Sequence, residues 1–288
     1  MSQDADRVRM FKAPDGLPLA LHDLGGQGEP ALLLHGITAN ARALDAVADD
    51  LRDGLHLYAL DFRGRGLSGS PAHGAAIPEH AWDAVAAIEA LRGPVHLIGH
   101  SLGALVALYL TAERPDLVAR LVLIDGAGDV PPANLEAIGP SLRRLETEYE
   151  DVERYAEALR AAPHLQPWNG YVEAFLRLDL QTLPSGRVRS RIDPRHISEE
   201  LLANAQLPTL RLSQERIARP ALILRAAAPV AKGLPPVFDR TTCLEAHATI
   251  QGSLLVELQN LHHYAIGFQP SSLRRAALRD FLLPAKDA

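Results

Sequence analysis

Residues 95–107 read Val-His-Leu-Ile-Gly-His-Ser-Leu-Gly-Ala-Leu-Val-Ala: an apolar run, a Gly-x-Ser-x-Gly pentapeptide and the start of a second apolar run. The first run, Val95 to Ile98, is short and continuous, which is typical of a strand buried on both faces. The second, Leu102 to Glu113, has helical spacing. The pentapeptide therefore predicts a sharp strand-to-helix turn, in which Gly99 and Gly103 avoid the clashes that a Cβ would cause.

Ser101 stands at the centre of this turn, where we expect its hydroxyl to be accessible. The first free amides of the following helix, including that of Leu102, would point at the reacting carbon and could stabilise an oxyanion. A helix N-cap is the alternative role for a serine after a strand, but capping does not require glycine on both sides. The pattern therefore favours Ser101 as a nucleophile.

The same alternation of strand and helix extends on both sides of the turn. Further short apolar runs occur at Ala31 to Leu34, Leu55 to Leu60, Leu121 to Ile124, Ala221 to Leu224 and Leu254 to Leu258. Segments with helical spacing lie between them or close the chain, at Ala43 to Leu51, Ala81 to Leu91 and Ser271 to Leu283. Asp15-Gly16 adds an opening β-hairpin. The chain is predicted to be α/β, with a mostly parallel central sheet flanked by helices.

The alternation stops between residues 126 and 219. Helical runs at Leu142 to Leu159, Gly170 to Leu180 and Ser198 to Ala203 are interrupted by prolines, which end helices. These prolines are Pro131-Pro132, Pro163, Pro167, Pro184 and Pro194. We therefore expect a core of residues 1–125 and 220–288 and, inserted at 126–219, a helical lid of several short helices.

Two loops accompany the turn at Ser101. Residues 33–38, Leu-Leu-His-Gly-Ile-Thr, and residues 61–68, Asp-Phe-Arg-Gly-Arg-Gly-Leu-Ser, each follow a strand. With the pentapeptide, they resemble the α/β-hydrolase superfamily, and the resemblance covers nearly the whole chain. It implies a serine hydrolase in which the Ile37 amide is the second oxyanion donor. A simple turn is the alternative for His35 and Gly36. In the second loop, Asp61 and Arg63 are expected to hold the turn together.

The resemblance also implies a histidine base in the loop after the last strand, because histidine has a pKa suited to taking a proton from serine. That loop, residues 259–265, contains His262 and His263. Family members often have a His-Tyr pair there, and aligning on it makes His263 the base. His262 remains the alternative.

The acid that orients the base is less clearly marked. The family's commoner position follows the strand at Ala221 to Leu224, but Ala226 and Pro229 stand there, and no carboxylate comes before Asp239. Some haloalkane dehalogenases and lactone hydrolases of this fold keep the acid after the preceding strand, where this chain has Asp125. We therefore expect Asp125 to be the acid, with Asp239 and Asp129 as alternatives.

The resemblance implies hydrolysis of carboxylic esters of small to medium size through an acyl-enzyme. The same triad could cleave a lactone, a C–C bond, a thioester or an amide, or perform perhydrolysis, and a ligand-binding receptor on a degenerate hydrolase fold is the non-enzymatic alternative. A serine nucleophile argues against dehalogenase and epoxide hydrolase chemistry. Four lid residues are expected to bind substrate or to pack in the lid core: Trp168, Tyr171, Phe175 and Leu178.

The composition limits the kinds of partner that the chain is expected to bind. The chain has 288 residues and a formal charge of −6, and it lacks a Lys/Arg run for nucleic acid. The polar start, Met1 to Arg7, and the lack of a long apolar segment predict a soluble cytoplasmic protein without a membrane partner. The motifs imply no cofactor and no metal. A small-molecule ester or lactone is the expected partner, and a homodimer is possible.

Overall fold

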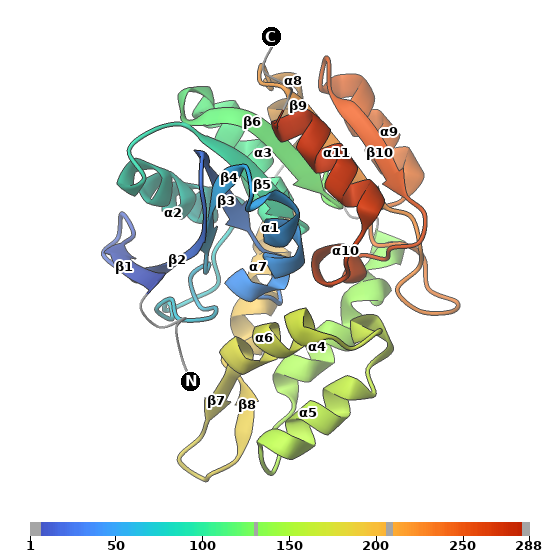
Figure 1. Cartoon of the computed structure of the whole chain (residues 1–288). Coiled ribbons are helices and arrows are strands. Elements are labelled where there is room, and N and C mark those ends of the chain that lie inside the picture. Colours follow the sequence, from blue (N-terminus) through green and yellow to red (C-terminus); the bar gives the residue numbers. More distant parts are fainter. Residues whose placement is uncertain (1–6, 130–131, 206–209, 284–288) are drawn as a thin grey trace.

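An eight-stranded sheet runs through the centre of the molecule (Figure 1). The computed structural model describes residues 7–129, 132–205 and 210–283, so Pro131 and most of the polar start lie outside the described residues. The strands are β1 (Val8–Lys12), β2 (Pro18–Gly26), β3 (Glu29–Leu34), β4 (Leu55–Leu60), β5 (Val95–His100), β6 (Val118–Ile124), β9 (Ala221–Ala226) and β10 (Leu254–Leu258). Their order in the sheet is β1-β2-β4-β3-β5-β6-β9-β10.

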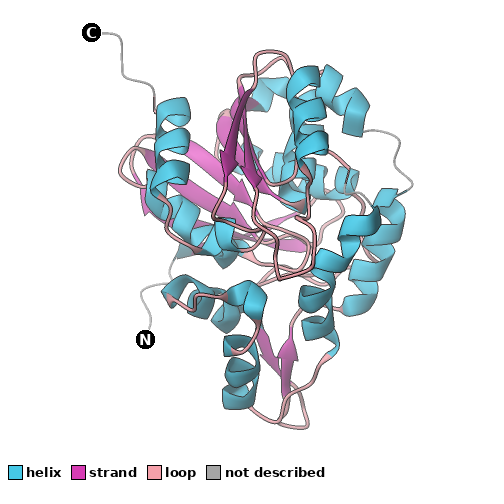
Figure 2. Ribbon diagram, turned by 90° about the vertical axis from the view of Figure 1, so that its right-hand side faces the viewer, coloured by secondary structure: helices cyan, strands magenta, loops and turns pink. Residues whose placement is uncertain are grey.

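The pairing is parallel from β4 to β10 and antiparallel only at the β1–β2 and β2–β4 pairs. The expected opening hairpin is the β1–β2 pair. Because parallel strands need crossover connections, helices cover both faces of the sheet (Figure 2). The α/β class with a mostly parallel sheet is therefore confirmed.

Each face of the sheet has its own apolar core, because successive side chains of a strand point to opposite faces. Leu32 and Leu34 pack with one set of helices, and Leu33 packs with the other. The first set contains α2 (Ile77–Ala90), α3 (Leu102–Glu113) and α9 (Arg240–Thr249). The second set contains α1 (Asp45–Leu51), α10 (Ala265–Phe268) and α11 (Ser272–Leu282).

The chain between β6 and β9, which we call the insertion, adds several short elements. They are η4 (Pro132–Ile138), α4 (Gly139–Glu146), α5 (Val152–Arg160), η5 (Pro163–Leu165), α6 (Gly170–Asp179), β7 (Leu180–Thr182), β8 (Val188–Ser190), α7 (Pro194–Ala205) and α8 (Leu210–Glu215). Figure 1 shows α4, α5, α6 and the β7–β8 hairpin grouped at the lower end of the view, beyond the sheet. The role of the insertion as a lid and its expected bounds at residues 126 and 219 stay predictions.

One expectation for the insertion was wrong, and one feature was missed. The run from Leu142 to Leu159 is not one helix, since Tyr149 pairs with Val188 and Asp151 caps α5 by accepting from the Arg154 amide. A hairpin, β7–β8, was also not expected. Both features depend on tertiary pairing, which helical periodicity in the sequence does not indicate.

No helix within the described residues has both the length and the apolar character needed to cross a membrane.

Candidate active site

Ser101 lies at the junction of β5 and α3, in the sharp turn that the sequence predicts. Its φ of 55° and ψ of −122° are strained for a residue with a side chain. The two flanking glycines are sterically required: a Cβ on Gly99 would lie 2.1 Å from the carbonyl oxygen of Gly103, and one on Gly103 would lie 2.1 Å from that of Leu34. The Ser101 amide donates to the Ile124 carbonyl at 3.0 Å, which fastens the turn to β6.

Asp125 follows β6 directly and lies against His263. The distance between His263 Nδ1 and Asp125 Oδ2 is 2.7 Å, and both side chains are buried. The other carboxylate oxygen of Asp125 accepts from the amide of Ala226 at 2.9 Å. Ala226 ends β9, which pairs with β6, so the backbone of the neighbouring strand supports the carboxylate of Asp125.

The alternative acids and the alternative base lie elsewhere. Asp239 caps α9 by accepting from the Thr242 amide at 2.8 Å, and Asp129 is exposed. The His262 Nδ1 accepts from two backbone amides of its own loop. Burial and the neighbouring His263 lower the pKa of His262 to about 4, so it is neutral near pH 7. Of the candidates, the structure brings together Asp125 and His263.

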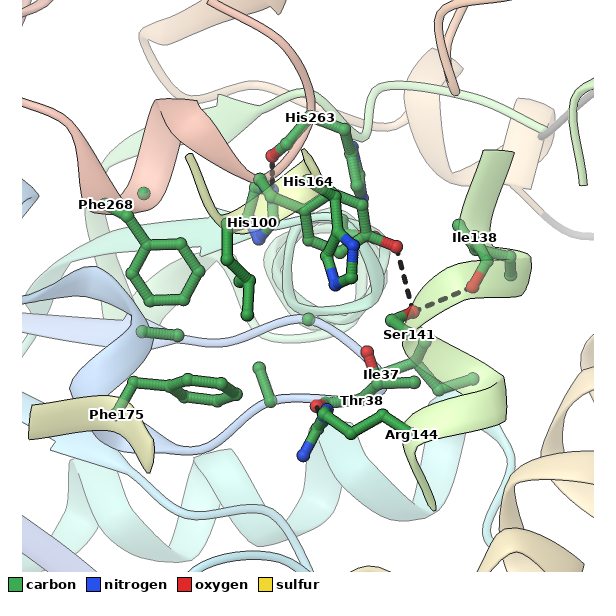
Figure 3. Close-up of a pocket in the computed structure, with 17 residues that line it drawn as sticks. Ile37, Thr38, His100, Ile138, Ser141, Arg144, His164, Phe175, His263 and Phe268 are labelled. Carbon is green, nitrogen blue, oxygen red and sulfur yellow. Dashed lines mark hydrogen bonds between the residues drawn. The ribbon is translucent and has the colours of Figure 1, made fainter. Parts of the chain in front are cut away.

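His100, the residue before Ser101, holds the loop of the candidate base. Its Nε2 donates to the carbonyl oxygen of His263 at 2.8 Å (Figure 3). Burial lowers the pKa of His100 well below its usual value, so the imidazole is neutral. A neutral ring with its proton on Nε2 fixes the backbone of His263 without adding a charge beside it.

The loop after β3 is fixed by His35. Its Nδ1 donates to the Gly36 carbonyl at 2.8 Å, and its Nε2 accepts from the Phe62 amide at 3.1 Å. Burial lowers the pKa of His35 to about 4, which matches this neutral tautomer. Because the carbonyl and amide of a trans peptide point in opposite directions, holding the Gly36 carbonyl also fixes the direction of the Ile37 amide.

The second loop has the structural role expected for it. Asp61 accepts from the Ala41 amide at 2.7 Å and from the Leu67 amide at 2.9 Å, so it ties its own turn to the loop after β3. Arg63 forms a paired contact with Asp83 of α2, with two nitrogen–oxygen distances of 2.7 Å.

One pocket contains Ser101 and His263. Its floor comes from the loops after β3, β5 and β10, and includes Ile37, Thr38 and Phe268. The insertion supplies its roof: Ile138, Ser141, Arg144, His164, Leu165 and Phe175 (Figure 3). The cavity that these residues line has a volume of about 40 Å³, which favours a small acyl group.

Of the four lid residues expected to bind substrate, only Phe175 lines this pocket. Trp168 and Tyr171 line a separate surface groove, and Leu178 lines neither hollow. Tyr171 and Leu178 lie about one helical turn before and after Phe175, roughly 5 Å along the axis, which carries them past the pocket. The expectation for Trp168, Tyr171 and Leu178 is therefore corrected.

Sequence reasoning missed several residues that line the pocket. Tyr264 donates to Ser141 Oγ at 2.8 Å, and Ser141 in turn donates to the Ile138 carbonyl. The His164 ring packs on Tyr264 with 5.0 Å between centroids, and its Nδ1 is buried without a hydrogen-bond partner in the described part of the chain. Tyr264 could have been found from its place after His263, but no motif marks His164 or Ser141.

Other chemistries find little support. No group of three or more His, Cys, Asp or Glu side chains is arranged to hold a metal ion within residues 7–129, 132–205 and 210–283. The one cysteine, Cys243, is buried, and burial raises the pKa of its thiol to about 12, so it is a poor nucleophile near neutral pH.

Comparison with known proteins identifies relatives of this chain. The model of the Alpha/beta hydrolase family matches residues 31–275. The chain is 30% identical to the 2-(acetamidomethylene)succinate hydrolase of Mesorhizobium japonicum over 169 residues, 58% of this chain and 55% of that protein. It is 33% identical to the (E)-2-((N-methylformamido)methylene)succinate hydrolase of Acinetobacter baylyi over 129 residues, 44% of this chain and 49% of that protein.

The matched part thus spans about half the length of these curated relatives. A solved structure of E-2-(acetamidomethylene)succinate hydrolase superimposes with a TM-score of 0.82 at 23% identity, covering 96% of this chain and 98% of that one. Such a likeness shows the fold, and the family model spans most of the chain. The chain therefore belongs to the alpha/beta hydrolase family.

Proposed function

We propose that this protein is a hydrolase that cleaves small neutral carboxylic esters through an acyl-enzyme, with Ser101 as nucleophile, His263 as base and Asp125 as acid. The observation that carries the proposal is the 2.7 Å contact between His263 Nδ1 and Asp125 in the pocket of Ser101. An ionised carboxylate accepts from Nδ1–H, which leaves Nε2 free to take a proton. The pair thus supplies the base that a serine hydroxyl needs.

The reaction proceeds in two halves. His263 takes the proton of the Ser101 hydroxyl while its oxygen attacks the ester carbonyl carbon. The amides of Ile37 and Leu102 stabilise the oxyanion, and His263 then gives its proton to the departing alcohol. Water, deprotonated by the same histidine, attacks the acyl-enzyme and releases the carboxylic acid and free Ser101.

The charge in the pocket favours a neutral acyl group. Arg144 is the guanidinium among the lining residues, and it already donates to Asp179 and to the Thr38 carbonyl. Burial and the charge of Arg144 lower the pKa of His164 to about 4, so this imidazole is neutral at pH 7. A carboxylate entering the pocket would lose part of its hydration without meeting an unpaired cation among the described lining residues, which is costly.

Amide hydrolysis is the second candidate, because the two curated relatives are named for N-acyl aminomethylene derivatives of succinate. Those names denote substrates with two carboxylates and an N-acyl group. The acyl parts, acetyl and formyl, are small enough for this pocket, but the carboxylates would have to stay outside it. Cleavage of lactones, thioesters or C–C bonds and perhydrolysis can each be tested by measuring turnover of one substrate of that class.

Fluorophosphonate labelling tests the proposal, since the reagent reacts with activated serines. The wild type is expected to be labelled on Ser101 and to hydrolyse 4-nitrophenyl acetate, and Ser101→Ala should lose both properties. Lack of an adduct on the folded wild type would overturn the hydrolytic site and favour a ligand-binding receptor. If acetamidomethylene succinate is turned over faster than any neutral ester, the amide candidate replaces the ester.

A further inference from the structure

The loop between β3 and η2 (Ala41–Leu44) is held through three consecutive carbonyl groups. The Gly36 carbonyl accepts from His35, which belongs to the same loop. The next two carbonyls, those of Ile37 and Thr38, accept instead from two buried arginines, Arg65 and Arg144. Both arginines are paired with acids of the insertion, so the loop is connected to it twice.

The first connection is the Arg65–Glu200 pair. Arg65 extends from the loop after β4, and its Nε and Nη2 lie 3.3 and 3.2 Å from the Ile37 carbonyl oxygen. The same guanidinium contacts Glu200 of α7 at 2.6 and 2.5 Å. Burial would raise the pKa of Glu200, but the charge of Arg65, together with hydrogen bonds from Arg65 and His80, outweighs burial and lowers the pKa to about 2. The pair is thus ionised and excluded from water.

The second connection is the Arg144–Asp179 pair. Arg144, on α4, donates to the Thr38 carbonyl at 2.7 Å, and Figure 3 shows the two residues together. Arg144 also contacts Asp179, the last residue of α6. Ser190 donates to the other carboxylate oxygen of Asp179 at 2.9 Å. Burial disfavours the charge on Arg144, yet Asp179 raises its pKa above the ordinary value. This pair is buried as completely as the first.

We infer that the insertion sets the oxyanion loop through these two ion pairs, and that Glu200 and Asp179 are positioning residues. The inference rests on the proposed function, in which the Ile37 amide stabilises the oxyanion. Removing the carboxylate of Glu200 or Asp179 leaves the partner arginine without its ion pair. The guanidinium can then turn to other contacts and no longer holds the loop carbonyl. Since a displacement of about 1 Å at a reacting group costs on the order of 100-fold in rate, a small tilt of this loop is enough to matter.

The chain offers a matched control in the Arg63–Asp83 pair. It is also buried and ionically paired, with nitrogen–oxygen distances of 2.7 Å, and it begins in the same loop as Arg65. It contacts α2 and Asp15 instead of the loop after β3. Asp83→Asn therefore breaks a similar pair without releasing the Ile37 or Thr38 carbonyl.

The experiment measures kcat and KM for 4-nitrophenyl acetate over a range of pH, below the unfolding temperature of each variant. Glu200→Gln and Asp179→Asn should lower kcat about 10- to 100-fold, with KM changed less than about threefold. The pH at half-maximal kcat should not move, because His263 and Asp125 are untouched. Asp83→Asn should keep the wild-type kcat although it lowers the unfolding temperature.

A double variant separates positioning from stability. Replacing both members of a buried pair by apolar residues often restores stability, so Arg65→Met/Glu200→Met should unfold near the wild-type temperature and yet keep the low kcat. Recovery of kcat together with stability would overturn the inference, and so would equal losses of kcat in Glu200→Gln and Asp83→Asn. A wild type that neither hydrolyses the ester nor reacts with fluorophosphonate would instead overturn the proposed function itself.

Discussion

The floor and the roof of the pocket differ in how their residues are held. The floor groups follow strands of one sheet, and backbone contacts fix them: Asp125 accepts from the Ala226 amide, and the His263 carbonyl accepts from His100. The roof comes from short elements of the insertion, and it is held to the floor largely by side chains, such as Arg144 on Thr38. We therefore expect floor variants to lose kcat, and roof variants that line the pocket to change KM and substrate choice.

The largest effect is expected at the floor, for Asp125→Asn. Without a carboxylate, His263 is held in the wrong tautomer and its charged form is not stabilised, so kcat should fall about 10⁴-fold. Asp239→Asn is the control, since Asp239 caps α9, and it should retain kcat within about twofold. Initial rates with 4-nitrophenyl acetate measure both; an Asp125→Asn enzyme within tenfold of the wild type would show that the acid has been misassigned.

The next effect concerns the stability of the contact between roof and floor. Glu200→Gln leaves Arg65 buried without its partner, which should cost about 3 kcal/mol of unfolding free energy at pH 7. The pKa of Glu200 is lowered to about 2 in the folded chain. Its contribution is therefore complete above the unfolded pKa, near 4.5, and is lost as the pH falls toward 2.

Urea unfolding at pH 7 and pH 3 checks this prediction. The difference between wild type and Glu200→Gln should be largest at pH 7 and should shrink at pH 3. A difference that grows on acidification would contradict the ion pair.

A smaller effect is expected for Phe175→Ala in the roof. Loss of a buried phenyl face in the pocket should weaken binding by about 1.5 kcal/mol, so KM for an acetyl ester should rise about 10-fold. Longer acyl chains should become better substrates, because the space of the ring is vacated. The ratio of kcat/KM for butanoyl and acetyl esters reports this, and an unchanged ratio would remove Phe175 from the acyl pocket.

The smallest effect is expected for Tyr171→Phe. Tyr171 lies about one helical turn from Phe175 but donates to Asp49 at 2.8 Å in an exposed contact outside the pocket. An exposed hydrogen bond contributes little to stability, and kcat/KM should stay within about twofold. A tenfold loss of kcat/KM would show instead that Tyr171 belongs to the substrate site.

This contrast also explains what the sequence could predict. The turn at Ser101 demands glycines at fixed spacing, so it can be recognised without a structure, and the parallel strands are continuous apolar runs. Asp125 could be chosen because Pro229 leaves the commoner position without a carboxylate, and β6 and β9 do lie side by side. The helices on both faces of the sheet follow from such local rules, whereas the order of the strands was not predicted.

No local pattern in the sequence predicts the contacts that hold the roof. Arg65 and Glu200 are 135 residues apart, and nothing local in either neighbourhood indicates that they meet. Arg144 lies in a run that reads as one long helix, although Tyr149 interrupts it by pairing with Val188. Contacts of this kind depend on tertiary packing, which hydrophobic periodicity does not predict.

The acyl-enzyme itself gives the most direct test of the proposed chemistry. Rapid mixing of the wild type with excess 4-nitrophenyl acetate should release a burst of nitrophenol close to one equivalent if deacylation is slower, and quenched samples should carry an acetyl group on Ser101 by peptide mapping. Ser101→Ala should show neither. Turnover without any acetylated Ser101 at early times, retained in Ser101→Ala, would contradict the account.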